Sequence, residues 1–339
     1  MRRWVVAAAM LGLLVSACGG GGGDRPHGAT RVGLVFDIGG RGDKSFNDSA
    51  YRGLERAQSE LGVEIQYMEP TEGADRETGL REYASRGFDL VIGVGFMFTD
   101  DVEKIAREFP NVKFACVDYT VKFDAQGNPM PPPNNVVGLR FREEEGSFLA
   151  GAAAALVSQT GVIGFVGGMD MPLIHKFEAG YRAGARHVRP EIQLLVGYAG
   201  VTAQAFKDPA KGKELASSMY GRGADVIFHA SGTTGFGVFE AARERGKLAI
   251  GVDSDQYDEA PGHVLTSMVK DVDVAVFETI RRVRDGHFTG GVEELGLREG
   301  GVHIVRDARN RDLLPDAVDV RVRALSDSVA QGLIHVPKE

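Results

Sequence analysis

From Thr30 onward, short apolar runs alternate regularly with longer amphipathic stretches, and this alternation limits the possible folds more than any other feature of the chain. The runs RVGLVFDI, DLVIGVG and VKFACVDY are rich in β-branched residues and almost continuously apolar, which is typical of parallel strands buried on both faces. Helical patterns follow most of the runs, at residues 49–61, 77–86, 100–109, 143–159, 174–188, 209–221, 235–246, 272–285 and 314–332. Two such series predict an α/β protein with two doubly wound, parallel-sheet lobes.

A polar, proline-rich segment, VKFDAQGNPMPPPNN, separates the two series and is predicted to contain no regular structure. Three later extended patterns, VVGLRF, HVLTSMV and GVHIVRD, are expected to pass between the lobes as a three-stranded hinge. We therefore assign residues 30–137 and 268–299 to an N-terminal lobe, and residues 138–267 and 300–335 to a C-terminal lobe. The length of 339 residues agrees with this division, because it exceeds the size at which a single core keeps growing.

The first residues are predicted to direct export. Arg2 and Arg3 precede an apolar stretch at 4–15 that is short for a bilayer span but suits a secretory signal, so residues 1–17 are expected to be a signal peptide. The sequence LVSAC resembles the lipobox of bacterial lipoproteins, and we expect lipid to be attached at Cys18. Residues 18–29 are rich in glycine and would form a flexible tether. The globular body would then be anchored by lipid to a membrane of the cell envelope, on its extracytoplasmic side.

Charge and composition argue against several functions. The formal net charge of −8 disfavours binding to the phosphates of a nucleic acid. The His and Cys residues form no spaced cluster, so no metal site is expected, and the glycine order of SGTTGFG is the reverse of a dinucleotide-binding loop, so no cofactor is expected. Cys116, within the apolar run VKFACV, reads as a buried core residue with no partner for an internal disulfide.

Polar residues that directly follow apolar runs are the candidates for a ligand site, because ligands of open α/β sheets bind beyond the carboxyl ends of the strands. Asp37, Asp118 and Asp253 each end a predicted strand and could accept hydrogen bonds from sugar hydroxyls or from a base N–H. Each could instead cap a helix or pair with a lysine. Lys270, at the end of LTSMVK, could pair with one of these acids, contact a ligand oxygen, or be a plain surface lysine.

Two aromatic residues stand in polar surroundings. Phe46 lies in the glycine-rich loop DIGGRGDKSFN, and Phe206 precedes the helical stretch that begins at residue 209. Each ring could stack on a planar base, which contributes about 1–3 kcal/mol, or could simply fix its helix to the core. Together with the aspartates, the rings favour a neutral ligand that has hydroxyl groups and a flat apolar part.

Six ordered motifs between about residues 31 and 323 resemble the basic membrane protein family, which comprises nucleoside-binding lipoproteins similar to the purine nucleoside receptor of spirochaetes. The motifs are DIGGRGDKSFNDSAYRGL, FREEEGSFLAG, GFVGGMDMPLIHKFEAGYRAG, DPAKGKELASSMYGRGADVIFHASG, GVDSDQY and LTSMVKDVDVAVFETI. The resemblance implies a type I periplasmic-binding-protein fold. It also implies a receptor, not an enzyme, that acts as a monomer and delivers nucleosides, with purine nucleosides favoured, to the permease complex of an ABC importer.

The resemblance implies roles for eight residues of this chain. Phe46 of DKSFN and Phe206 of AFKDP look like the pair that holds the base between them. The implied contacts to the base edge are Asp37, Asn47 and Asp118, and the implied contacts to the ribose are Gly232, Asp253 and Lys270.

Three segments depart from the family pattern. They are the longer approach to Phe206 in YAGVTAQAFKDP, the sequence SGTTGFG around Gly232, and the proline-rich insert after Asp118. Two alternative functions stay open at this point. One is a receptor of the same fold for a sugar or a signalling ligand, and the other is a nucleoside hydrolase that uses the same acids.

Overall fold

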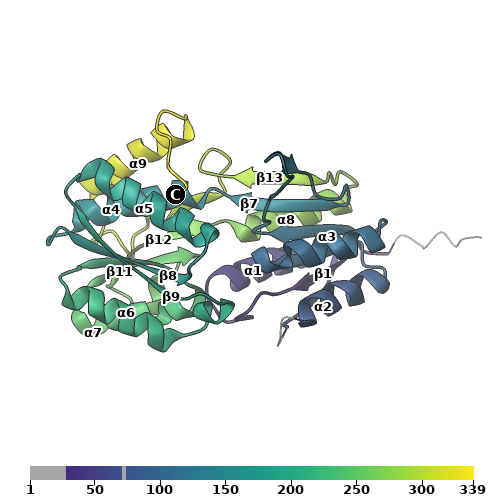
Figure 1. The fold of residues 1–339 in the computed structure, drawn as a ribbon, viewed down its shortest axis with the longest axis horizontal. Helices are drawn as coiled ribbons and strands as arrows, with labels where there is room; N and C mark the ends of the chain where they lie inside the picture. The colour runs from purple at the N-terminus through teal and green to yellow at the C-terminus, as the bar shows by residue number, and fades with distance from the viewer. Residues whose placement is uncertain (1–27, 71–73) are drawn as a thin grey trace, which may run out of the picture.

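The computed structural model describes residues 28–70 and 74–339, and it confirms the two α/β lobes expected from the sequence (Figure 1). Each lobe is built on a six-stranded sheet with helices packed on both faces. The predicted signal peptide at 1–17, the lipidation site Cys18 and nearly all of the tether at 18–29 lie outside the described residues. Among the described residues, no helix combines the length and the hydrophobicity needed to cross a bilayer.

The sheet of the first lobe is parallel throughout. Its strands, in spatial order, are β2 (Glu64–Met68), β1 (Arg31–Val35), β3 (Leu90–Val94), β4 (Lys113–Val117), β7 (Val136–Phe141) and β13 (Gly291–Leu295). The helices of this lobe are α1 (Phe46–Leu61), α2 (Ala74–Ser85), η1 (Phe96–Phe98), α3 (Thr99–Glu108) and α8 (Val272–Arg284). Helices α1 and α8 pack together on one face, and α2 and α3 cover the opposite face.

The second lobe repeats this plan with one antiparallel edge strand. Its strands, in spatial order, are β9 (Gln193–Gly200), β8 (Val162–Met169), β10 (Val226–Ala230), β11 (Leu248–Asp253), β12 (Val264–Lys270) and the antiparallel β14 (Val302–Ile304). Its helices are α4 (Glu143–Val157), α5 (Pro172–Val188), η2 (Ala203–Phe206), α6 (Pro209–Gly221), η3 (Gly232–Thr234), α7 (Gly235–Arg245), η4 (Tyr257–Glu259) and α9 (Asp316–Ala330). Helices α4, α5 and α9 lie on one face, and α6 and α7 lie on the other.

Within the described residues, the chain crosses between the lobes three times, in agreement with the predicted hinge. Strands β7 and β12 remain in their own sheets to their last residues, so the first two crossings fall at Arg142 and Asp271. These positions are a few residues later than the boundaries after 137 and 267 proposed from the sequence, because an extended pattern does not show which sheet a strand joins. The third crossing runs from β13 to β14 through residues 296–301.

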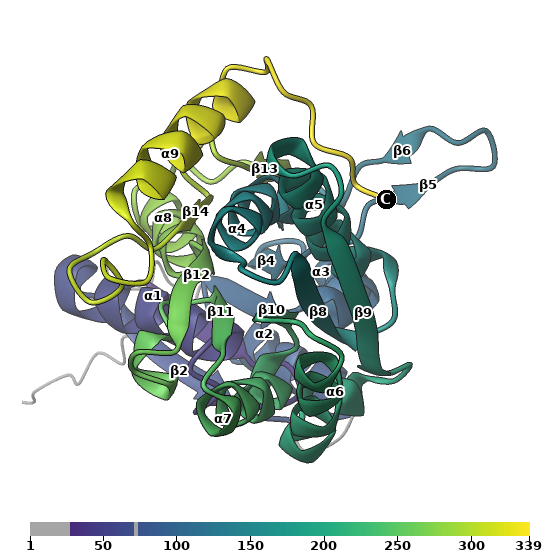
Figure 2. The same cartoon turned by 90° about the vertical axis from the view of Figure 1, so that its left-hand side faces the viewer.

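Two elements differ from the sequence-based expectation. Strand β13 was not predicted, since GVEEL is only half apolar and lies at the edge of its sheet. The proline-rich segment, expected to be irregular, forms a short hairpin of β5 (Lys122–Phe123) and β6 (Pro129–Met130) that projects from the body (Figure 2). Its turn is held by Asp124, whose carboxylate accepts backbone N–H groups at 2.9 and 2.8 Å, which is the usual role of aspartate in turns.

Cys116 lies on β4, is buried and has a free thiol, which confirms the core position predicted for it. Burial raises the pKa of this thiol well above its usual range. A thiol in such surroundings is inert, because the thiolate is the reactive form.

Candidate ligand-binding site

A cavity lies between the two lobes, at the carboxyl ends of the strands of both sheets. The space within it, counting the part open to solvent, is about 690 Å³. All eight residues singled out by the sequence line this one cavity: Asp37, Phe46, Asn47, Asp118, Phe206, Gly232, Asp253 and Lys270. The structure therefore brings the whole predicted set together, while its role in binding stays a prediction.

The first-lobe wall is the glycine-rich loop between β1 and α1, and a single buried carboxylate organises it. Asp43 accepts hydrogen bonds from the backbone N–H groups of Ser45 at 2.9 Å and Asn47 at 2.8 Å, and from the Asn47 Nδ2 group at 3.1 Å. In turn, Asn47 Oδ1 accepts the backbone N–H of Asp37 at 3.2 Å. Much of the hydrogen-bonding capacity of Asn47 thus fixes the loop, which leaves one N–H for a ligand.

Asp37 is the carboxylate that this loop presents to the cavity. Its Oδ1 atom accepts the N–H of Ile38 at 2.7 Å, whereas no described residue donates to Oδ2. A Cβ atom at Gly95 would lie 2.1 Å from Oδ2, and Gly95 has φ +108°, so only glycine leaves room for the carboxylate. Burial raises the pKa of Asp37 to about 7, although the Ile38 N–H and the charge of Arg76 oppose the shift.

The two aromatic rings reach the cavity from different lobes. Phe46 is the first residue of α1, and Phe206 is the last residue of η2. The ring of Phe206 packs closely against Gly168 of β8, where a Cβ atom would come within 2.4 Å of it. Gly232 has φ +58° and approaches the backbone of Phe206 closely. A Cβ atom at position 232 would lie 3.0 Å from the carbonyl oxygen of Phe206. The lack of a side chain at Gly232 therefore lets η3 pack closely against the Phe206 backbone, and Gly232 also lines the cavity.

Asp118 and Asp253 occupy matching places in the two lobes, one just after β4 and one at the end of β11. Both are buried, and both have the left-handed backbone, with φ +59° and +62°. This conformation costs an L-residue about 1–2 kcal/mol, and such strain is often found at ligand sites.

Lys270, the last residue of β12, pairs with Asp118 across the two lobes. Its Nζ atom donates to both carboxylate oxygens of Asp118, at 2.9 and 2.8 Å, and lies 4.7 Å from the centre of the Phe46 ring. Burial disfavours the ammonium, but the charges of Asp118, Glu143 and Asp253 outweigh it and raise the pKa of Lys270. Burial also raises the pKa of Asp118, to about 6, although the charge of Lys270 opposes the shift. The Asp118–Lys270 pair is therefore charged at pH 7 and joins the two lobes.

Asp253 is held by a residue that the sequence analysis did not single out. The Ser45 hydroxyl, from the first lobe, donates to Asp253 Oδ2 at 2.7 Å, and the Ser254 hydroxyl returns a bond to the Ser45 carbonyl at 2.9 Å. No described residue donates to Asp253 Oδ1, so this oxygen can accept a hydrogen bond from a ligand. Nothing local in the sequence signals the contact, because its partners are 208 positions apart.

His229, which contacts the cavity-lining Ser231, has properties that disfavour acid–base catalysis. His229 is fully buried, and its ring nitrogens lie 3.1 Å from Gln256 Oε1 and 3.3 Å from the hydroxyl of Ser231, which lines the cavity. Burial lowers the pKa of His229 to about 4, whereas an efficient general base has a pKa near the working pH. Over the part of the chain that the structure describes, no group of three or more His, Cys, Asp or Glu residues could hold a metal ion.

Comparisons with known proteins agree with this geometry. A family model described as "ABC transporter substrate-binding protein PnrA-like" matches residues 30–339. An uncharacterized lipoprotein of Pyrococcus abyssi is 38% identical over 89% of this chain and 77% of its own length. Basic membrane protein A of Borreliella afzelii is 35% identical over 91% of this chain and 92% of its own length.

Among solved structures, a solute-binding protein of an ABC transporter system from Aeropyrum pernix K1 superimposes with a TM-score of 0.80 at 31% identity. The match covers 91% of this chain and 94% of that chain. The two lobes thus have the type I periplasmic-binding-protein fold that the sequence predicted. The family model describes substrate-binding proteins, and this structural relative is a solute-binding protein. Both place the chain among the solute-binding proteins of ABC transporters.

Proposed function

Because the chain belongs to the PnrA-like family of ABC transporter substrate-binding proteins, we propose that it binds purine nucleosides in the interlobe cavity and delivers them to an ABC permease. The observation that carries this proposal is the pairing of Phe46 and Phe206, which reach one cavity from opposite lobes. Two faces of a flat base can each gain about 1–3 kcal/mol from such stacking. A sugar has no comparable flat surface.

The polar groups of the cavity suit the edges of a nucleoside. Asp37 Oδ2 lies on the first-lobe wall and Asp253 Oδ1 on the second, and neither is bonded to a described residue. We assign Asp37 to N–H groups of the base and Asp253 to the ribose hydroxyls. Asp118 and Lys270 already neutralise each other, so they offer their remaining hydrogen-bonding capacity without adding net charge.

The proposal includes the cellular setting. Relatives such as the Pyrococcus abyssi protein are named lipoproteins, and the sequence LVSAC around Cys18 resembles a lipobox. We propose that lipid at Cys18 holds the binding domain on the outer face of a membrane, where closure of the lobes around a nucleoside presents the complex to the permease.

Calorimetric titration of the purified protein with adenosine, guanosine, inosine, cytidine and ribose tests the proposal. We expect micromolar or tighter binding of purine nucleosides, because stacking and charge-assisted hydrogen bonds of about 1.5–3 kcal/mol act together. Ribose alone should bind far more weakly. Chromatography of the same mixtures should show intact nucleosides, and release of free base would support a hydrolase instead. An absence of heat with all four nucleosides would refute the proposal.

The affinity is also expected to depend on pH through Asp37. In the empty protein the pKa of this carboxyl is about 7, and N–H donors of a base favour its ionised form, so binding should release a proton. Affinity should therefore be highest above pH 7 and fall as the pH drops through 7, by about tenfold between pH 8 and pH 6. Isothermal titration across this range measures the effect. In an Asp37→Asn variant the profile should lose this step, and a profile with the same step in both proteins would contradict the assignment.

A further inference from the structure

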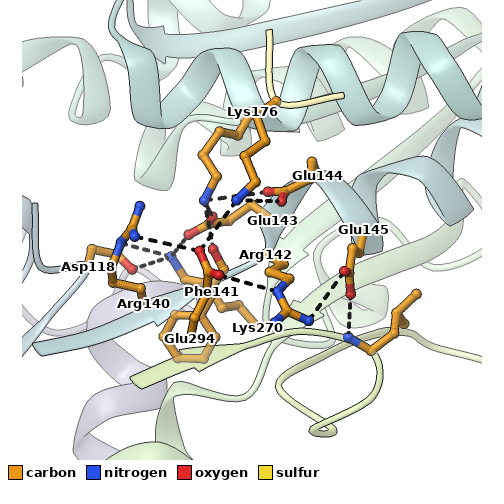
Figure 3. A network of polar contacts seen from close by, with 12 residues as sticks. Asp118, Arg140, Phe141, Arg142, Glu143, Glu144, Glu145, Lys176, Lys270 and Glu294 are labelled. Carbon is orange, nitrogen blue, oxygen red and sulfur yellow. Dashed lines mark hydrogen bonds and ion pairs between the residues drawn. The ribbon is translucent and has the colours of Figure 1, made fainter. Parts of the chain in front are cut away.

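A network of charged residues leads from the ligand cavity into the hinge (Figure 3). From Asp118 and Lys270, the next contact is with Glu143, whose Oε1 atom lies 3.5 Å from Lys270 Nζ. Lys176 forms an ion pair with Oε2 of the same glutamate, and it donates a hydrogen bond of 2.7 Å to the carbonyl oxygen of Phe141. Glu143 therefore lies between two lysines, and Figure 3 shows these side chains converging.

The members of this network come from both lobes and border the crossings. Asp118 and Phe141 belong to the first lobe, and Phe141 is the last residue of β7. Lys270 ends β12 directly before the crossing at Asp271, and Glu143 begins α4 directly after the crossing at Arg142. Lys176, on α5, thus connects the second lobe to the end of a first-lobe strand.

The third crossing is reached through a side branch of the network. Lys338, near the end of the chain, lies 3.7 Å from Glu144 Oε1 and 3.5 Å from Glu294 Oε1. Glu294 is on β13 of the first lobe, whereas Glu144 is on α4 of the second. The Nζ atom of Lys176 lies 3.5 Å from Glu144 Oε2. This contact links the side branch to the Asp118–Lys270–Glu143–Lys176 network.

The charged side chains at the centre of this network are buried, so each of them depends on its partner. The side chains of Lys270 and Glu143 are 2% and 1% exposed, and that of Lys176 is 12% exposed. A buried charge is tolerated only when it is paired. Burial alone would raise the pKa of Glu143, but the charges of Lys176 and Lys270 outweigh it and lower the pKa. Glu143 therefore remains an anion that attracts Lys270, although it does not itself line the ligand cavity.

We propose that Glu143 and Lys176 are positioning residues for ligand binding, which orient Lys270 against Asp118 and thereby couple the occupied cavity to the closed arrangement of the lobes. The inference rests on the proposed function and names the residues that would transmit binding to the hinge. Two of the three N–H groups of Lys270 are used by Asp118 in the opposite lobe. The charge of Glu143 attracts the same ammonium from the α4 side. Without this charge, the Lys270–Asp118 bridge loses its orientation, and with it the link between the lobes.

The test is Glu143→Gln, which removes the charge and keeps the shape. The dissociation constant for the best-bound nucleoside should rise about tenfold or more, because a contact within a coupled polar network is lost. Lys176 contacts Glu143 instead of Lys270, and its side chain is partly exposed. The Lys176→Met variant should also weaken binding. Lys176→Arg retains the charge and should restore most of the affinity. The control is Glu178→Gln, also on α5, whose carboxylate contacts Arg182 and Tyr198 within the second lobe and which should leave affinity unchanged.

A second readout does not depend on a ligand. Spin labels at Ser59→Cys on α1 and Ser218→Cys on α6 report the distance between the lobes, and both positions are exposed, whereas Cys116 is buried. The Glu143→Gln variant should show longer interlobe distances than the wild type, and the Glu178→Gln variant should not.

The outcomes separate the two proposals. Should the wild type bind no nucleoside, the proposed function fails, and the interlobe distances of the ligand-free proteins then decide the positioning role alone. Nucleoside binding by the wild type, with unchanged affinity and unchanged distances in Glu143→Gln, would overturn the inference even where the melting temperature falls. A variant that fails to fold is replaced by Lys176→Met, with the same two measurements and the same criteria.

Discussion

Replacing Lys270 with methionine is expected to destabilise the folded protein by about 3–5 kcal/mol, because it removes one partner of a buried ion pair. Methionine has a similar length and fits an apolar surrounding, so little packing is lost. Asp118 would be left as a buried carboxylate without its two hydrogen bonds of 2.9 and 2.8 Å, and Glu143 would lose one of its two neighbouring lysines. Denaturant unfolding, followed by fluorescence and circular dichroism, measures the loss in free energy of unfolding.

Two further variants show whether the lost pairing causes this effect. Lys207→Met makes the same chemical change at an exposed position and should alter stability by no more than about 0.5 kcal/mol. Adding Asp118→Asn to Lys270→Met removes the orphaned charge, and asparagine tolerates the left-handed backbone at 118. The double variant should therefore be more stable than the sum of the two single changes predicts. Equal losses in Lys270→Met and Lys207→Met would show that the buried pair does not contribute.

The gathering of the candidate site in one cavity follows from information that is local in the sequence. In a parallel sheet the carboxyl ends of the strands lie at one edge, so Asp37 and Asp118 of the first sheet had to face a common region once their strands were identified. Asp253 ends a strand of the second sheet and joins them only because the two lobes face each other. The left-handed backbone of Asp118 and Asp253 is not visible in the sequence, because aspartate adopts this conformation only where the surrounding structure imposes it.

Contacts between the lobes lie beyond sequence reasoning for a different reason. Glu143 and Lys176 both occur in recognisable motifs, FREEEGSFLAG and GFVGGMDMPLIHKFEAGYRAG, yet no periodicity within a motif shows that they meet at the hinge. The same holds for Ser45 and Asp253, whose contact depends on how two separately folded lobes approach each other. Edge elements were also missed, since β13 and the β5–β6 hairpin have little of the burial that creates a clear pattern.

The second large effect concerns ligand affinity. Replacing Phe46 with alanine should weaken purine nucleoside binding by about 5- to 150-fold, which corresponds to the loss of about 1–3 kcal/mol of stacking. The ring begins α1 and is only half-buried in the empty cavity, so its removal costs little core packing. Titration calorimetry with adenosine at pH 8, where Asp37 is ionised, isolates the contribution of the ring.

Phe46→Leu distinguishes stacking from simple hydrophobic contact. Leucine retains most of the apolar volume beside Lys270, whose Nζ atom lies 4.7 Å from the ring centre, but it has no aromatic face. If the ring stacks on the base, Phe46→Leu should lose nearly as much affinity as Phe46→Ala, and Phe206→Ala should lose a similar amount on the opposite face of the base. Full affinity in Phe46→Leu would show that the ring only fills space. In that case any stacking on the base would come from Phe206 alone, and Phe206→Ala would show whether an aromatic ring contributes to the choice of ligand.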